Sequence, residues 1–188
     1  MPKLGVVVAS VREGRSGLAV AQWFIDRARL HGGFEPVLID LKEVKLPLME
    51  EPHHPRLQKY QHETTKSWSA MVAPLDAFVF VSAEYNYSTP PALVNALDHL
   101  YLEWNYKAAG LVTYGGISGG LRAAQALKLT LMALKIVPIN EAVPIPFFSQ
   151  MIDKETGRFT GSDVLEKGVV TMLDELKRWE GALRTLRA

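Results

Sequence analysis

Hydroxyl and guanidinium side chains gather in the segment Ser10–Gly17 (SVREGRSG), directly after an apolar run. Two hydroxyls, two guanidinium groups and the free N–H groups of a helix start are the donors that bind a phosphate dianion. A second interpretation is a solvated turn in which Ser16 caps the following helix. The segment contains neither the G-x-x-x-x-G-K-S/T nor the G-x-G-x-x-G pattern, which argues against magnesium nucleotide chemistry. The candidate anion ligands are Ser10, Arg12, Arg15, Ser16 and Gly17.

A second segment, Ser82–Pro91 (SAEYNYSTPP), presents aromatic and amide side chains after another apolar run. Ring faces and an amide edge suit a flat heteroaromatic ligand that carries both donors and acceptors. The alternative interpretation is a plain turn with packed tyrosines. The side chains concerned are Tyr85, Asn86 and Tyr87, and Glu84 directly precedes them.

A third segment, Tyr114–Gly120 (YGGISGG), is rich in glycine. Glycines let backbone N–H groups approach a ligand closely, so the candidates here are Tyr114, Gly115 and Gly116. The segment also has the G-x-S-x-G form of a hydrolase nucleophile elbow, with Ser118 as the serine. Such a triad places its histidine after the serine, whereas every histidine here precedes Ser118, which disfavours a serine hydrolase. The histidines are His31, His53, His54, His62 and His99.

Apolar runs and segments with helical spacing alternate along the chain. The runs do not alternate with polar residues, which is typical of strands that are covered on both faces. Alternating strands and helices predict a doubly wound α/β sheet of five parallel strands, whose ligands bind at the carboxyl ends of the strands. The predicted strands are Lys3–Ala9, Glu35–Leu41, Leu75–Ser82, Ala108–Tyr114 and, more weakly, Val137–Ile145, and the predicted helices are Gly17–His31, Leu57–Ala73, Pro91–Tyr101, Ser118–Leu134 and Ser162–Arg187.

The length, net charge and composition of the chain exclude several classes of protein. The 188 residues fit one domain, residues 1–188, with a sizeable core. The net charge of +1, without a run of like charges, argues against a nucleic-acid or anionic-membrane partner. Because cysteine is absent, disulfides and thiol chemistry are excluded. The start MPKLGVVVAS has no long apolar stretch behind a basic lead, so we expect a cytoplasmic protein.

The three polar segments, in this order and at these strand ends, resemble the NAD(P)H-dependent FMN reductase family of flavodoxin-like proteins. The resemblance spans roughly residues 3–180. It implies a sheet of order 2-1-3-4-5 with helices on both faces, an FMN phosphate held by the first segment, and a flavin ring beside the second and third. Two positions depart from the family pattern, since Ala83 replaces a common proline and Ala9 replaces a common glycine.

The resemblance implies an activity as well. It predicts non-covalently bound FMN, hydride transfer from NADPH or NADH, and onward transfer of electrons to an acceptor such as a quinone, another flavin, an azo dye or a metal oxyanion. The cofactor carries the redox chemistry, so we name no catalytic acid or base. It also implies that backbone groups of Tyr114–Gly116 stabilise the negative charge that develops on reduction. The alternative is a non-enzymatic, flavodoxin-type electron carrier, although the near-zero charge lacks the acidic docking face of such carriers.

Two further groups of residues admit more than one interpretation. His53 and His54 stand beside Glu50 and Glu51 without the helical spacing of a metal site, so we expect a surface loop and no metal. The aromatic cluster is either a packed core edge or, as the resemblance favours, part of the interface of a homodimer or homotetramer. Its members are His99, Tyr101, Trp104 and Tyr106.

Overall fold

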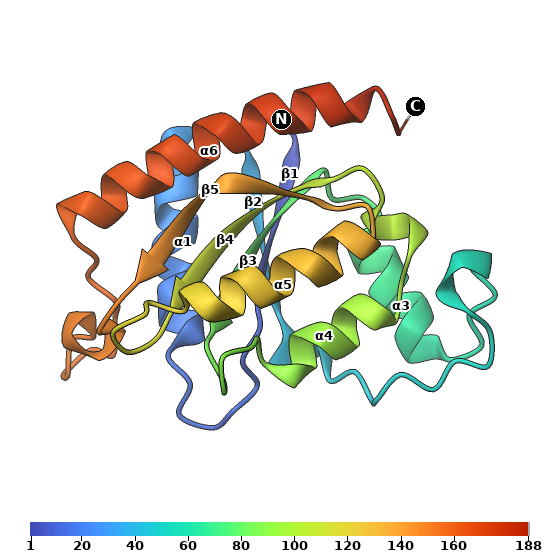
Figure 1. Ribbon diagram of the computed structural model, residues 1–188, viewed down its shortest axis with the longest axis horizontal. Helices are drawn as coiled ribbons and strands as arrows, with labels where there is room; N and C mark the ends of the chain where they lie inside the picture. The colour runs from blue at the N-terminus through green and yellow to red at the C-terminus, as the bar shows by residue number, and fades with distance from the viewer. Residues whose placement is uncertain (188) are drawn as a thin grey trace.

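Five parallel strands form one sheet in the computed structural model, which describes residues 1–187. The strand order is β2-β1-β3-β4-β5, which confirms the order expected from the sequence (Figure 1). Because the strands are parallel, the loops that follow them all leave from one edge of the sheet, here called the carboxyl edge. The strands are β1 (Lys3–Val8), β2 (Glu35–Asp40), β3 (Ala77–Ala83), β4 (Ala108–Tyr114) and β5 (Val137–Ile145).

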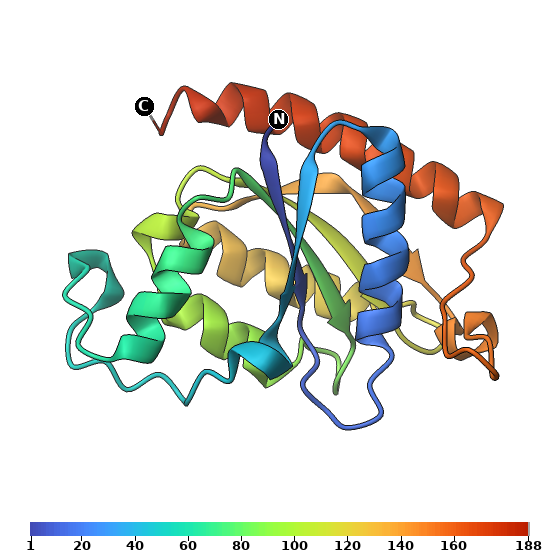
Figure 2. The same cartoon turned by 180° about the vertical axis from the view of Figure 1, so that it is seen from behind.

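Helices cover both faces of this sheet, as Figures 1 and 2 show from opposite sides. On one face, Phe24 and Met172 pack against strand residues such as Val79. On the other face, Trp68 and Leu97 pack against strand residues such as Phe78. The central strands β3 and β4 are therefore buried along their whole length. The helices are α1 (Gly17–His31) and α6 (Asp163–Arg184) on the first face, α3 (Glu63–Val72), α4 (Pro91–Asp98) and α5 (Leu121–Ala133) on the second, and the one-turn α2 (Leu41–Val44) after β2.

The predicted helix Leu57–Ala73 is shorter in the structure. A 3-10 turn, η1 (Pro55–Leu57), comes first, and Gln58 then takes a left-handed backbone conformation with φ of 51°. The chain resumes helical geometry only at Glu63, where α3 begins. The helix α2 has no counterpart among the predicted elements. It begins where the Asp40 side chain accepts a hydrogen bond from the Lys42 N–H, a short cap that carries no hydrophobic periodicity.

Two members of the aromatic cluster are buried within the chain, which agrees with the packed core edge as the interpretation of these two residues. Trp104 and His99 are each 1% exposed. The Trp104 ring packs against Trp68 and Phe78 of the same chain. These residues belong to the core of the α3–α4–α5 face, so an interface cannot be built on them.

The loop that carries His53 and His54 is exposed, as expected. The His54 ring nitrogen Nδ1 accepts a hydrogen bond from the Arg56 N–H and so caps the 3-10 turn. None of the helices within residues 1–187 is both long and apolar enough to cross a membrane.

Candidate functional site

The loops after β1, β3, β4 and β5 meet at the carboxyl edge and enclose a hollow of about 280 Å³. Nine of the eleven residues proposed from the sequence line it, and two of those eleven, Gly17 and Asn86, do not. We call it the carboxyl-edge hollow. Its lining residues are Ser10, Arg12, Arg15, Ser16, Ala83, Glu84, Tyr85, Tyr114, Gly115, Gly116 and Phe148.

Hydrogen bonds join the loops into one unit. The Ser10 hydroxyl lies 2.6 Å from the Tyr85 hydroxyl, which links the loops after β1 and β3. The Glu84 N–H donates to the Tyr114 carbonyl oxygen at 3.2 Å, and the Gly115 N–H donates to the Ile145 carbonyl oxygen at 3.3 Å. Residues far apart in sequence are thus fixed around one space, which is the arrangement that the three segments predict.

The loop after β1 supplies the positive charge of the hollow. Arg12 is exposed, whereas the Arg15 side chain is only 9% exposed and forms an ion pair with Asp40 at the end of β2. The pair engages Arg15 Nη2, and Arg15 Nη1 is buried without a hydrogen-bond partner. Within residues 1–187 it is the only buried side-chain nitrogen or oxygen in that condition. A buried donor without a partner is costly unless a ligand or water satisfies it.

The start of α1 adds backbone donors at the same place. Ser16 is the N-cap residue, but its hydroxyl makes no capping hydrogen bond, so the simple capping interpretation is wrong. The first N–H groups of a helix have no partner within the helix and favour an anion. Ser16 and the two arginines therefore surround a point of positive potential.

Gly17 leaves space for a neighbouring side chain. It does not line the hollow, and a Cβ built there would lie 2.6 Å from the Tyr114 hydroxyl oxygen. The glycine lets the Tyr114 side chain reach the start of α1. Burial raises the pKa of Tyr114 above its ordinary value, so this hydroxyl stays neutral at physiological pH.

The carboxylate of Glu84 is bound within the chain. It accepts hydrogen bonds from the Arg122 guanidinium, including one from Nε at 2.7 Å, and one from the Ser118 hydroxyl at 3.1 Å. Arg122 holds the pKa of Glu84 below its usual value. Glu84 therefore anchors the loop after β3 to the beginning of α5. Ser118 donates to a carboxylate here, and the structure records no hydrogen bond between Ser118 and a histidine among residues 1–187.

Asn86 lies at the tip of a tight hairpin. Tyr85 and Ser88 exchange backbone hydrogen bonds of 2.8 and 2.9 Å, and the two residues between them have φ of 50° and 68°. Positive φ at both central positions is the type I′ pattern, which asparagine tolerates. Tyr87, the second of them, stacks under the Arg122 guanidinium at 3.9 Å from the ring centroid. Asn86 is exposed and is not among the residues that line the hollow.

The glycines of the loop after β4 have two distinct functions. Gly120 has φ of 82°, and a Cβ there would lie 2.8 Å from Thr113 Cβ, so this turn requires glycine. A Cβ at Gly116 would meet no atom within 4 Å. The backbone at Gly116 is therefore open to approach from the hollow.

Two lining residues were not predicted from the sequence. Ala83 is the last residue of β3, and Phe148 follows β5. The Phe148 ring makes an edge contact with Tyr114 at a centroid distance of 5.0 Å. A signal for Phe148 was present, since β5 is parallel to β4 and its exit loop, which carries Phe147 and Phe148, leaves from the same edge.

Comparisons with known proteins identify the family of the chain. The sequence model of NADPH-dependent FMN reductases matches residues 2–150. The chain is 36% identical over 148 residues to an NAD(P)H-dependent FMN reductase of Schizosaccharomyces pombe, covering 77% of this chain and 74% of the relative. It is 34% identical over 158 residues to the NAD(P)H-dependent FMN reductase LOT6 of Saccharomyces cerevisiae, covering 77% and 81%.

A solved structure extends the likeness to the fold. The flavoenzyme NAD(P)H:(acceptor) oxidoreductase FerB of Paracoccus denitrificans superposes with a TM-score of 0.78 at 21% identity, over 97% of this chain and 98% of FerB. The fold is thus flavodoxin-like, with the strand order found here. Sequence and fold together establish that the chain belongs to the NADPH-dependent FMN reductase family.

Proposed function

We propose that this protein is an FMN-dependent NAD(P)H oxidoreductase and that the carboxyl-edge hollow holds the FMN. The observation that carries the proposal is the buried, unpartnered Nη1 of Arg15 beside Ser10, Arg12 and Ser16. A phosphate dianion satisfies such a donor, and the helix start and the second arginine favour the same charge. Larger hollows exist on the surface, but this one combines an unpartnered buried cation with a helix start.

The remaining lining residues fit the flat part of the cofactor. Tyr85, Tyr114 and Phe148 provide aromatic surface, and the Gly115–Gly116 backbone provides hydrogen-bonding groups without side chains in the way. These residues would hold the ring, while Glu84 would keep the loop after β3 in place through Arg122.

Bound FMN supplies the redox chemistry by taking a hydride from NADPH or NADH and passing electrons to an acceptor. The chain itself would bind FMN, orient it and shield it from water. Arg12, Arg15 and Ser16 would neutralise the phosphate, and the Gly115–Gly116 backbone would stabilise negative charge on the ring. The Tyr114 hydroxyl retains its proton because burial raises its pKa, so it would be available as a hydrogen-bond donor and would not act as a base.

The acceptor class, the choice between NADPH and NADH, and self-association belong to the same proposal. We propose a quinone, a flavin or a similar small molecule as the acceptor, and a homodimer or homotetramer as the assembly. Large apolar side chains are exposed on α5, where Leu129 and Met132 are 74% and 64% exposed, and Leu48 is 83% exposed. Exposed apolar residues that share one helix face are typical of an interface with a second copy.

Titration of the purified protein with FMN, followed by rapid mixing with NADPH, tests the function. We expect saturable FMN binding, visible as quenched flavin fluorescence, and fast bleaching of the bound flavin by NADPH. An electron carrier would bind FMN but oxidise NADPH slowly, which separates the two functions. Arg12→Ala should weaken FMN binding with the free energy of unfolding unchanged, because this side chain is exposed. If Arg12→Ala retains the wild-type FMN affinity, Arg12 is not a phosphate ligand.

A further inference from the structure

Asp40 joins the loop after β1 to the start of α2. It is the last residue of β2, and it does not itself line the carboxyl-edge hollow. Its Oδ2 atom accepts a hydrogen bond from Arg15 Nη2, and its Oδ1 atom accepts one from the Lys42 N–H at 3.1 Å. Both carboxylate oxygens are therefore engaged. Figure 2 shows the loop after β1 and α2 together at the lower end of the sheet.

The ion pair of Arg15 and Asp40 is shielded from water, because each side chain is only 9% exposed. A guanidinium is planar and rigid, so fixing one terminal nitrogen also fixes the direction of the other. With Nη2 on Asp40, the Nη1 atom of Arg15 is buried and has no hydrogen-bond partner within residues 1–187. The Asp40 carboxylate thus determines where this unpartnered donor lies.

The charge of Asp40 and its geometry have opposite effects on a bound anion. A negative charge close to Arg15 repels a phosphate and offsets part of the attraction that the arginine exerts. If Asp40 acted only through its charge, its removal would strengthen phosphate binding. If it orients Arg15, its removal weakens phosphate binding, because the guanidinium can then leave the position in which it meets the phosphate. The sign of the change distinguishes the two roles.

We propose that Asp40 is a positioning residue for the phosphate of FMN, and that it makes the site selective for FMN over riboflavin. It holds Arg15 Nη1 toward the phosphate, so it contributes nothing to the binding of a flavin that lacks this group. This inference rests on the proposed function, since it requires FMN in the carboxyl-edge hollow. It adds a residue of β2 to a site whose lining residues come from the ends of β1, β3 and β4 and the loops after β1, β3, β4 and β5.

The test compares Asp40→Asn with the wild type. Asparagine keeps an oxygen that accepts from the Lys42 N–H, but it then presents an amide nitrogen to Arg15, and two donors do not bind each other. A second variant is Asp40→Ser, because serine also caps a helix start but has no second oxygen for Arg15. The matched control is Glu43→Gln, which removes the same charge from an exposed side chain of α2.

Fluorescence titration with FMN and with riboflavin gives two dissociation constants for each protein. We expect both Asp40 variants to bind FMN about fivefold to tenfold more weakly than the wild type, and riboflavin within about twofold of it. Glu43→Gln should leave both constants unchanged. A purely structural role of Asp40 would weaken the binding of both flavins by the same factor, and urea denaturation reports any loss of stability separately.

A double-mutant cycle with Arg15→Lys shows whether Asp40 acts through Arg15. In the Arg15→Lys background we expect Asp40→Asn to change FMN affinity by less than about twofold, because lysine has no second nitrogen to orient. Unchanged or tighter FMN binding by Asp40→Asn, an equal loss for both flavins, or the full loss in the Arg15→Lys background would each overturn the proposal. Failure of the wild type to bind FMN would instead refute the proposed function.

Discussion

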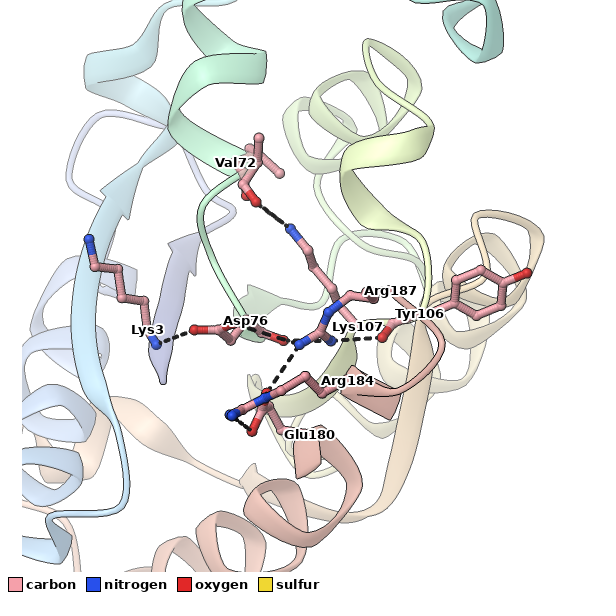
Figure 3. Close-up of polar contacts among 9 residues, drawn as sticks. Lys3, Val72, Asp76, Tyr106, Lys107, Glu180, Arg184 and Arg187 are labelled. Carbon is pink, nitrogen blue, oxygen red and sulfur yellow. Dashed lines mark hydrogen bonds and ion pairs between the residues drawn. The ribbon is translucent and has the colours of Figure 1, made fainter. Parts of the chain in front are cut away.

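The carboxyl edge of the sheet and the opposite edge, where the strands begin and which we call the amino edge, both carry clustered charges. Within residues 1–187, only the carboxyl edge has a buried side-chain donor without a partner. At the amino edge, Arg187 donates to the Tyr106 carbonyl oxygen at 2.9 Å and to Glu180 at 3.1 Å (Figure 3). Lys107, which is 5% exposed, donates to the carbonyl oxygens of Val72 and Ala73. The polar groups drawn there are satisfied by the chain itself.

The charged groups of the carboxyl edge differ from those of the amino edge in whether they have hydrogen-bond partners within the chain. The Arg15 side chain is 9% exposed, against 17% for Arg187 and 2% for Glu180, yet its Nη1 has no partner. Arg12 adds further positive charge there. A charge cluster with internal partners stabilises the fold, whereas a cluster with an unpaired member is prepared for a ligand. The contrast predicts which substitutions change binding and which change stability.

Arg15→Lys should produce the largest effect, and it should be on binding. Lysine keeps a positive charge beside Asp40 but lacks the second guanidinium nitrogen. We expect FMN affinity to fall about tenfold to a hundredfold, since a charge-assisted hydrogen bond contributes about 1.5–3 kcal/mol. Riboflavin, which lacks the phosphate, should bind as it does to the wild type. Fluorescence titration with both flavins measures the ratio, and an equal loss for the two flavins would contradict a phosphate contact.

Arg187→Met should have the opposite profile. It removes the cation that joins Glu180 of α6 to the segments before β3 and β4, and Glu180 is only 2% exposed. We expect the free energy of unfolding to fall by about 1–2 kcal/mol, because two carbonyl oxygens lose their donor while Glu180 keeps Arg184 as a partner, with FMN affinity unchanged in the folded fraction. Urea denaturation measures the loss. Arg29→Met, which removes an exposed pair with Asp26, serves as the control and should be nearly neutral.

The sequence predicted the donors of the carboxyl edge but not the partners that distinguish the two edges. The strands, their order and the three polar segments follow from apolar runs, helical spacing and the family resemblance. The donors of the carboxyl edge were therefore identified in advance, with Ser10, Arg12, Arg15 and Ser16 among them. The partners were not, because Asp40 is 25 residues from Arg15 and no local pattern connects them.

The features of the site that the sequence did not predict depend on tertiary packing. Asn86 and Gly17 follow strand ends as expected but do not line the hollow, since Asn86 lies in a type I′ turn and Tyr114 occupies the space beside Gly17. The interaction of Glu84 with Arg122 spans 38 residues. The amino-edge cluster was not predicted at all, because each of its charged residues is unremarkable within its own segment.

Lys107 should make the free energy of unfolding depend on pH, which tests the stabilising role of the amino edge. Burial lowers the pKa of Lys107 to about 8, from an ordinary value of 10.5. Between these values the unfolded chain binds the proton and the folded chain releases it, so the free energy of unfolding rises with pH across this window. Relative to Lys107→Met, which has no such titration, the wild type should gain on the order of 1–2 kcal/mol. Urea denaturation at both ends of the window measures this, and parallel curves would contradict it.

Arg122→Gln should give the smallest effect, because it removes a positioning contact and no ligand donor. In the variant, Glu84 keeps the Ser118 hydroxyl and the backbone N–H of residue 122 as donors, so we expect FMN affinity to fall only about threefold at neutral pH. The pH profile is more diagnostic. In the wild type, Arg122 holds the pKa of Glu84 below its usual value, so the loop anchor is present above that pKa and is lost as pH falls through it.

Without the guanidinium, the pKa of Glu84 rises and the anchor is lost at a higher pH. Acid titrations of FMN binding should therefore be displaced to higher pH in Arg122→Gln, whereas Arg178→Gln, which removes an exposed pair with Glu175 on α6, should leave the profile unchanged. Coincident profiles for Arg122→Gln and the wild type would mean that Glu84 does not control the loop after β3. FMN binding at the carboxyl edge would then depend on its cations alone. The pair of Glu84 and Arg122 would have no separate anchoring role there.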